Sequence, residues 1–502
     1  MTRTTGLDRK FVWHPFTQMR DWMREDPIVI TSGRGSWLKD EQGRSYLDAN
    51  SSIWTNLHGH AHPAINKAMR VQMERVSHVS ALGLANKPAS LLASKLVQAA
   101  RQGRGRPQLD RVFYSDNGST AVETALKLAY EFTRRTRGGN QRPRFLSLAG
   151  GYHGDTVGAV SLGKIDLFHK AYRDLLFPSD KVMAPYCYRC PYNRAKPERA
   201  DARVYRRCQW ECIGQLEKKL ALQNRRDNPF AAFVFEPLVQ GAAGVIPQPE
   251  GWLRKASERV RASGALLVAD EVMTGFGRTN TGPFKDGRPR LFACQEEQVQ
   301  PDLLCLAKGL TGGYLPMAAT LVTQDIFDAF LGKYEEFKTF FHGHSYTANP
   351  LGAAAALASL KLLNTPATTR SRLSLARHLK QNLSALWDLT HVGDIRQVGS
   401  LAGIELVQDW KTREPYPLKA RAGMRVCQAM ARRGVLTRPI GNVILLMPPY
   451  CTTSEEVAIM VATLNRAIRE TLGNPAKIST GPRPENFKKT GKPSGVWEHP
   501  GR

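Results

Sequence analysis

The stretch LLCLAKGLTGG, at residues 303–313, joins a short apolar run to a lysine and a glycine-rich turn. Four apolar residues in succession predict a strand that is buried on both faces of a parallel sheet. Lys308 follows this strand closely, so its amine would be partly desolvated, which lowers the pKa of a lysine and makes it a candidate Schiff-base amine. An ATP-binding P-loop is excluded, because Ala307 precedes the lysine and no glycine lies five residues before it. A surface lysine in a tight turn is the alternative.

Four further apolar runs, at 111–115, 144–148, 231–236 and 265–269, also predict strands. Segments with helical periodicity alternate with these runs, which is typical of a mostly parallel α/β sheet. Each run is followed by a polar or glycine-rich segment. Because ligands bind beyond the carboxyl ends of parallel strands, these segments predict one shared site.

Two of these segments carry groups that suit a flat, phosphorylated cofactor. Gly118 and Ser119 lie at a turn between a strand and a helix, where free backbone N–H groups and the helix dipole favour a phosphate. Tyr152 and His153 lie in the loop GYHG, whose glycines allow an aromatic ring to be presented for stacking. A plain helix cap and an ordinary turn aromatic are the alternative interpretations.

Asp270 follows the apolar run ALLVA and would be buried there. A buried carboxylate is costly unless a cation or hydrogen-bond donors meet it. A protonated ring nitrogen would be such a partner, whereas capping of the next helix is the alternative. Taken in order along the chain, the phosphate turn, the aromatic loop, Asp270 and Lys308 describe a site for pyridoxal 5′-phosphate.

This order resembles that of the class III, fold-type I aminotransferases. The segments that carry the resemblance are FEP (235–237), DEVMTGFGR (270–278), PD (301–302) and AKG (307–309). The resemblance implies an α/β fold, in which a large, mainly parallel, seven-stranded cofactor domain has helices on both faces and a smaller α+β domain is built from both termini. The expected boundaries are 1–70 and 351–473 for the small domain, 71–350 for the large one with a Cys/Arg-rich insertion at 186–228, and 474–502 for a basic flexible tail.

The resemblance also implies the roles of individual residues. The catalytic groups would be Lys308, Asp270 and Tyr152. The cofactor would be held by Gly118, Ser119, Tyr152, His153, Glu236, Asp270, Lys308 and, from the other subunit of a homodimer with a shared active site, Ser345.

Four motifs, WHPFTQM (13–19), NSSIW (50–54), FHGHSY (341–346) and TRPIG (437–441), are similar to one branch, the 7,8-diaminopelargonic acid synthases. These biotin-pathway enzymes aminate 8-amino-7-oxononanoate. The similarity implies that substrates contact Phe16, Trp54, Tyr152, Gly343 and Arg438, with Arg438 paired to a carboxylate. Phe16, Ile53 and Leu445 stand where members that use S-adenosylmethionine have Tyr, Trp and Tyr. This departure favours lysine over S-adenosylmethionine as amino donor.

The composition is that of an ordinary globular protein with a strong positive charge. The 502 residues include 71 Lys and Arg against 44 Asp and Glu, a net charge of +27 that is also a nucleic-acid signature. No DNA- or RNA-binding motif accompanies the charge, so it is interpreted as a solvated basic surface without a specific nucleic-acid partner. No apolar run approaches the roughly 20 residues of a membrane span. With no apolar leader and eight cysteines, we expect a reducing, cytoplasmic location and no membrane partner.

Four cysteines form two close pairs, Cys187 with Cys190 and Cys208 with Cys212. Thiolates in such pairs could hold a structural zinc, although the second spacing is looser than in the usual finger. No metal is expected at the catalytic site. The alternatives for the whole chain are another class III aminotransferase that pairs an ω-amino acid or amine with pyruvate or 2-oxoglutarate, a basic nucleic-acid-binding protein, and a zinc-stapled scaffold without catalysis.

Overall fold

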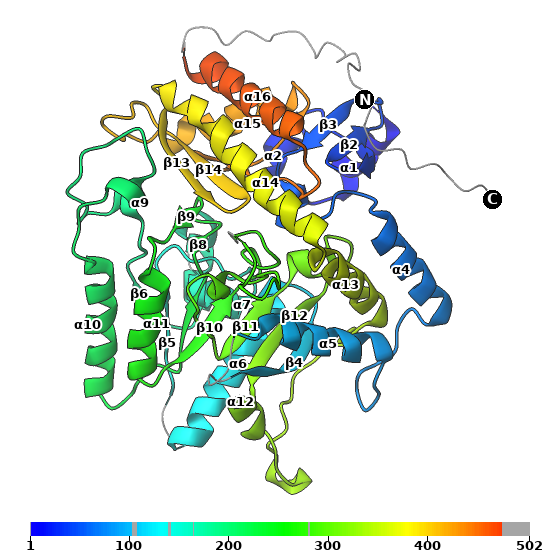
Figure 1. Ribbon diagram of the computed structural model, residues 1–502, viewed down its shortest axis with the longest axis vertical. Helices are drawn as coiled ribbons and strands as arrows, with labels where there is room; N and C mark the ends of the chain where they lie inside the picture. The colour runs from blue at the N-terminus through cyan, green and yellow to red at the C-terminus, as the bar shows by residue number, and fades with distance from the viewer. Residues whose placement is uncertain (1, 103–107, 139–141, 164, 280–281, 474–502) are drawn as a thin grey trace.

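The computed structural model describes residues 2–102, 108–138, 142–163, 165–279 and 282–473, and its centre is a seven-stranded sheet (Figure 1). The strands lie in the order β4 (Leu109–Ser115), β12 (Ala318–Thr323), β11 (Leu303–Leu306), β10 (Leu266–Asp270), β7 (Ala232–Phe235), β5 (Phe145–Leu148) and β6 (Asp180–Val182). β12 runs antiparallel to both of its neighbours, and the other adjacent pairs are parallel. The predicted mainly parallel α/β fold is confirmed.

The five predicted strands are present as β4, β5, β7, β10 and β11. Their apolar runs are explained by layers of helices on both faces of the sheet, since successive residues of a strand point to opposite faces. Leu303 and Cys305 of β11 belong to the core that α6 (Gly118–Arg137) supplies. Leu304 and Leu306 belong to the core shared by α5 (Lys87–Ala100) and α11 (Trp252–Ala262). The helices therefore bury the whole strand that leads to Lys308.

Segments from both ends of the chain form two smaller sheets beside the large one. The first has the order β1 (Ile30–Arg34), β2 (Trp37–Asp40), β3 (Ser45–Asp48) and β15 (Val435–Leu436), and the second has the order β13 (Val392–Val398), β14 (Leu401–Leu406), β17 (Val443–Leu446) and β16 (Pro439–Ile440). Because β3 pairs with β15, the N-terminal and C-terminal parts share a sheet, as predicted. Helices α14 (Pro366–Leu383) and α15 (Ala422–Ala431) both pack on α16 (Ser454–Leu472). The exact domain boundaries stay predictions.

The Cys/Arg-rich stretch 186–228 divides into two parts, which the sequence analysis did not separate. Its second part is the regular helix α10 (Glu211–Arg225), which packs on α11 and β6. Ile213, Leu216 and Leu220 are buried at positions i, i+3 and i+7, a helical pattern that is hard to see among so many charged residues. Only 186–208, with the short helix α9 (Ala202–Tyr205), lies outside the regular layers.

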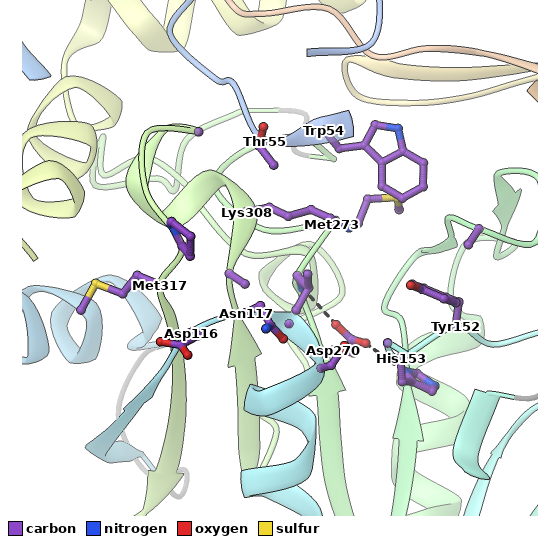
Figure 2. Close-up of a pocket in the computed structure, with 18 of the residues that line it drawn as sticks. Trp54, Thr55, Asp116, Asn117, Tyr152, His153, Asp270, Met273, Lys308 and Met317 are labelled. Atoms are coloured by element: carbon purple, nitrogen blue, oxygen red, sulfur yellow. Dashed lines mark hydrogen bonds and ion pairs between the residues drawn. The ribbon is translucent and has the colours of Figure 1, made fainter. Parts of the chain in front are cut away.

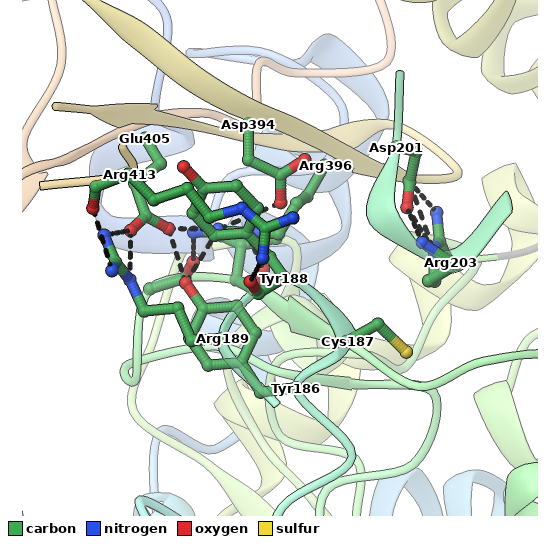
Figure 3. Close-up of polar contacts among 12 residues, drawn as sticks. Tyr186, Cys187, Tyr188, Arg189, Asp201, Arg203, Asp394, Arg396, Glu405 and Arg413 are labelled. Carbon is green, nitrogen blue, oxygen red and sulfur yellow. Dashed lines mark hydrogen bonds and ion pairs between the residues drawn. The ribbon is translucent and has the colours of Figure 1, made fainter. Parts of the chain in front are cut away.

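This loop region is attached to the second small sheet through a buried charge network (Figure 3). Arg396 of β13 is 1% exposed and its Nη1 contacts Glu405 and Asp394. Tyr186 donates its hydroxyl to Glu405, and Arg189 Nε donates to the same carboxylate at 2.7 Å. Arg396 also donates to the carbonyl oxygens at 244 and 245, at 2.6 and 2.8 Å, in the hairpin between β8 (Val239–Gln240) and β9 (Ile246–Pro247).

Replacing Arg396 by methionine is expected to lower the free energy of unfolding by about 3–5 kcal/mol, because it leaves the buried carboxyl group of Asp394 without its cation and Glu405 with Arg189 alone. Denaturant unfolding followed by far-UV circular dichroism measures this loss. Arg189→Met is the matched control, since Glu405 would keep Arg396 as a partner and Arg189 is more exposed than Arg396. An equal loss for both variants would contradict the central role of Arg396.

Within the described part of the chain, no helix is long and apolar enough to cross a membrane. The basic tail predicted at 474–502 lies outside the described residues.

Candidate active site

A cavity of about 430 Å³ lies beyond the carboxyl ends of β10 and β11, where the sequence predicts the shared site (Figure 2). Widely separated segments of the chain meet there, because parallel strands bring their carboxyl ends to one edge of the sheet. The predicted site residues that line the cavity are Trp54, Gly118, Ser119, Tyr152, His153, Glu236, Asp270 and Lys308.

Asp270 is the last residue of β10 and lies at the base of the cavity. It is 4% exposed, and its Oδ1 accepts from the backbone N–H of Val272 at 3.1 Å. Its Oδ2 lies 2.8 Å from His153 Nδ1. Two donors therefore fix a buried carboxylate that can hold a proton on a ring nitrogen facing it.

His153 supports Asp270 from a loop that presses against the first turn of α6. The loop approaches this closely because residue 154 is glycine, with φ of +123°, where a Cβ would lie 2.0 Å from Ser119 Oγ. His153 is 3% exposed, and its Nε2 has no hydrogen-bond partner among the described residues. Its Nδ1 faces Asp270, so the ring orients the carboxylate.

Lys308 comes from the strand next to Asp270. β10 and β11 pair in parallel with Asp270 opposite Cys305, so the lysine starts three residues further along the neighbouring strand. Burial lowers the pKa of Lys308, while the negative charges of Asp270 and Glu236 oppose this effect. A lowered pKa increases the fraction of neutral amine, which is the form that attacks a carbonyl carbon. Lys308 Nζ lies 4.6 Å from the ring centre of Trp54.

Glu236 and Tyr152 occupy one wall of the cavity. Burial, together with the negative charge of Asp270, raises the pKa of Glu236 to about 7. Glu236 accepts from the backbone N–H of Tyr152 at 3.1 Å and of Gly241 at 2.7 Å. Burial also raises the pKa of Tyr152, whose hydroxyl donates to Asp155 at 2.7 Å. Near neutral pH Tyr152 is thus uncharged and Glu236 is partly protonated.

The other end of the cavity is the N-terminus of α6, a helix of 20 residues. Its first turn has backbone N–H groups without partners inside the helix and the positive end of the helix dipole. A Cβ on Gly118 would lie 2.7 Å from Val272 Cγ1, so only glycine allows α6 to start this close to the segment after Asp270. Ser119 Oγ accepts from the N–H of Asp155 at 3.1 Å and keeps its own hydrogen to donate.

These groups fit pyridoxal 5′-phosphate. The N-terminus of α6 suits the phosphate, the carboxylate of Asp270 suits the ring nitrogen, and the amine of Lys308 suits the aldehyde carbon. The fit rests on the donor set and on the cradle around Gly118, which an added Cβ would fill.

Replacing Gly118 by alanine is expected to weaken cofactor binding by about tenfold or more, because overpacking against Val272 costs about 1–3 kcal/mol and shifts the start of α6. The dissociation constant of pyridoxal 5′-phosphate, measured from its absorbance, checks this expectation. Gly214→Ala is the control, since a Cβ at this α10 glycine meets nothing within 4 Å. Unchanged affinity in Gly118→Ala would contradict the phosphate assignment.

Trp54 reaches the cavity on an unusual turn that the sequence analysis missed. The four residues Ser51–Trp54 have φ of 47°, 47°, 64° and 69°, so all lie in the left-handed region although none is glycine. This conformation costs about 1–2 kcal/mol for each residue. No glycine or asparagine inside the turn signals it, so the sequence indicates Trp54 but not the backbone that carries it.

Four predicted site residues do not line the cavity of the single chain: Phe16, Gly343, Ser345 and Arg438. Phe16 is 58% exposed and packs edge to face on Phe168, with ring centres 5.4 Å apart. Ser345 lies on an exposed segment, where its carbonyl oxygen is 2.8 Å from His78 Nε2. Their assigned roles stay predictions.

Sequence reasoning missed several lining residues: Thr55, Asp116, Ala242, Val272, Met273, Tyr314, Leu315, Pro316 and Met317. The last four follow the glycine-rich turn after Lys308. The glycine-rich turn could have indicated them. A chain that reverses its direction beside a strand end places the residues after the turn close to the same cavity.

The fold brings the two cysteine pairs together, because Cys187 interacts electrostatically with Cys190, Cys208 and Cys212. Among the residues described, no group of three or more His, Cys, Asp or Glu side chains could hold a metal ion. Burial raises the pKa of Cys187 to about 12 and that of Cys212 to about 11. Zinc binding by these four cysteines stays a prediction.

Comparison with known proteins identifies the family of this chain. The family model for aminotransferase class III matches residues 19–468. An adenosylmethionine-8-amino-7-oxononanoate aminotransferase from Geobacter sulfurreducens is 46% identical over 93% of this chain and 97% of its own length. A protein of the same name from Nitratidesulfovibrio vulgaris is 48% identical over 93% of this chain and 81% of its own length.

Solved structures are similar over nearly the same extent. The crystal structure of the enzyme of that name from Methanocaldococcus jannaschii has a TM-score of 0.82 and 37% identity, covering 93% of this chain and 98% of the other. A PLP-bound amine transaminase from an uncultivated Pseudomonas species has a TM-score of 0.80 and 33% identity, covering 92% and 99%. The chain therefore belongs to the class III aminotransferases, a family of transaminases that use pyridoxal 5′-phosphate.

Proposed function

We propose that this enzyme transfers an amino group to the ketone of 8-amino-7-oxononanoate, which makes 7,8-diaminononanoate for biotin biosynthesis. The observation that carries the transaminase chemistry is the pair of Lys308 and Asp270 at adjacent strand ends in one cavity. The choice of acceptor is supported by relatives that are 40–48% identical and carry the name of that aminotransferase.

Each site residue then has a chemical task. When bound, pyridoxal 5′-phosphate supplies the electron sink that stabilises negative charge on the substrate carbon next to nitrogen. Gly118 and Ser119 hold the phosphate, Tyr152 packs on the ring, and Asp270 keeps the proton on the ring nitrogen. The neutral amine of Lys308 would remove a proton from the substrate carbon and deliver it to the former aldehyde carbon of the cofactor, and such positioned proton transfer contributes about 10²- to 10⁴-fold to the rate.

The substrate end of the site needs groups from beyond this cavity. Arg438 pairs with the carboxylate of the acceptor, for which its planar fork is better suited than a lysine. Trp54 and Phe16 line the approach. We propose a homodimer in which Ser345 of the partner subunit completes the site, and Gly343 is a further proposed substrate contact. The location we propose for the enzyme is the cytoplasm.

The amino donor we propose is lysine. Phe16 and Ile53 replace a tyrosine and a tryptophan that bulky S-adenosylmethionine would meet in the members that use it. The relatives carry adenosylmethionine in their names, so S-adenosylmethionine is the rival donor.

A half-reaction separates the donors and tests the function. Lysine and S-adenosylmethionine are offered separately to the pyridoxal form, and conversion to the pyridoxamine form is followed by absorbance. Conversion by lysine, and then reoxidation by 8-amino-7-oxononanoate, is expected. Conversion by S-adenosylmethionine alone would replace the donor but keep the acceptor. Conversion by alanine alone, without reaction of 8-amino-7-oxononanoate, would make the enzyme an amine or ω-amino-acid transaminase, a class to which several structurally similar proteins belong.

A further inference from the structure

The left-handed turn Ser51–Trp54 sets the position of Trp54 above Lys308, and something must hold it in that conformation. Within the turn, Thr55 N and Asn56 N both donate to the carbonyl of Ser51 at 3.0 Å. Bonds of this kind close a turn of either hand, so they do not by themselves select the left-handed form. The selection has to come from contacts outside the turn.

Arg278 supplies such contacts from the segment that follows Asp270. Its side chain is 1% exposed. Its Nη2 donates to Ser51 Oγ at 2.9 Å and to the carbonyl of Asn56 at 3.2 Å, one acceptor at each end of the turn. Its Nη1 donates to the carbonyl of Pro448 at 2.6 Å. One guanidinium therefore joins the N-terminal segment, the large sheet and the C-terminal segment.

The charge of Arg278 is not explained by an ion pair. Among the described residues, no carboxylate lies within 4.0 Å of its guanidinium nitrogens. The cation instead packs on the ring of Tyr450, with 4.9 Å from Cζ to the ring centre. A buried cation without a carboxylate is costly, so its value lies in directional hydrogen bonds that a planar fork can make to several acceptors at once.

The other contacts of the turn show why its two ends must be fixed. The hydroxyl of Ser51 donates a hydrogen bond to the carbonyl of Met447 at 2.6 Å. Asp48 accepts from Ser52 N at 3.2 Å and Ser52 Oγ at 3.0 Å, and from His60 Nε2 at 2.9 Å. Asp48 therefore fixes the start of the turn by hydrogen bonds, and Arg278 connects Ser51 at the start of the turn with Asn56 after its end.

We propose that Arg278 is a positioning residue, which holds the turn Ser51–Trp54 in its left-handed form and so keeps the Trp54 ring against the amine of Lys308. Arg278 touches neither the cavity nor the reacting atoms. It acts through Ser51 and Asn56, and it makes the placement of Trp54 depend on the C-terminal segment at Pro448.

Hydrogen exchange followed by mass spectrometry tests the proposal on the full-length holoenzyme. In Arg278→Met, a peptide that covers 51–57 is expected to exchange at least about tenfold faster than in the unmodified enzyme. Arg278→Lys should lie between the two, because an ammonium keeps the charge but cannot reach acceptors on both sides. In steady-state kinetics, the KM for the amino donor should rise more than kcat falls.

Arg372→Met is the matched control for the loss of a buried arginine. Arg372 is 5% exposed and its guanidinium also faces Tyr450, at 6.0 Å, but it donates to Arg290 O and Thr369 Oγ1 and does not contact the turn. It should lower stability and leave exchange at 51–57 unchanged. Equal exchange in the Arg278 and Arg372 variants would overturn the proposal.

A second variant keeps the test decisive if Arg278→Met does not fold. Ser51→Ala removes the acceptor of Arg278 at the start of the turn while the buried cation stays, and it should also speed exchange at 51–57. Slow exchange in Ser51→Ala would refute the proposal. The assignment of Trp54 to the substrate approach rests on the proposed function. Hydrogen exchange is measured without substrate, so the exchange result stays valid even if 8-amino-7-oxononanoate is not the amino acceptor.

Discussion

Replacing Lys308 by alanine is expected to lower the rate of transamination by about 10⁴-fold or more, because it removes both the amine that joins the cofactor and the base that moves the substrate proton. Among the described residues that line the cavity, Lys308 is the only one with an amine. Single-turnover absorbance measures the loss. Borohydride reduction, followed by intact-mass analysis, should no longer attach the cofactor covalently to the protein.

A small added amine provides the internal control for Lys308→Ala. Methylamine can enter the space that the truncated side chain leaves, and it should restore part of the rate in proportion to amine basicity if proton transfer is what was lost. Covalent attachment of the cofactor in the alanine variant, or turnover close to that of the unmodified enzyme, would refute the assignment of Lys308.

Replacing Asp270 by asparagine is expected to lower kcat by about 10²- to 10³-fold, the size of effect seen when one preorganised charge is removed from an active site. Asparagine has nearly the same shape and can still accept from Val272 N, so the fold should be kept. What is lost is the negative charge that keeps a proton on the ring nitrogen. The rate and the pH titration of the cofactor absorbance measure both consequences.

The neighbouring acid is a suitable control for Asp270→Asn. Glu271 is fully buried, but its carboxylate accepts from the N–H groups of Ala293 and Cys294 and does not line the cavity. Glu271→Gln should therefore reduce stability and leave kcat within about twofold. Equal loss of kcat in the two variants would mean that Asp270 acts through the fold and not through its charge.

The chemical groups of the site could be predicted from the sequence because they follow strand ends. An apolar run such as 303–306 predicts a buried strand, and the first polar residue after it must lie at the edge of the sheet. The same logic placed Asp270, Glu236, Tyr152 and Gly118 at one cavity, where the structure has them. The mainly parallel sheet was predictable for the same reason.

The walls of the cavity could not be predicted in this way. The left-handed turn at Ser51–Trp54 contains no glycine, and its hand is decided by contacts with residues far away in the sequence, such as Arg278 and Met447. Helix α10 was hidden because it was grouped with the basic stretch 189–226, although only Lys218, Lys219 and Arg225 among its own residues are basic. The cysteine pairs suggest zinc from their spacing, and zinc binding there stays a prediction.

The parallel pairing of β10 with β11 places the catalytic residues on a different part of the fold from the residues proposed to bind the substrate. Asp270 and Lys308 are held by the backbone spacing of two central strands, which no single side-chain change can alter. The groups proposed to choose the substrate come from the two ends of the chain, at Trp54 and Arg438. An amine transaminase with 33% identity and an omega transaminase with 26% identity have the same architecture, with TM-scores of 0.80 and 0.83. A mutant library directed at a new amine should therefore be concentrated around 51–54 and 438 and leave the central strands unchanged.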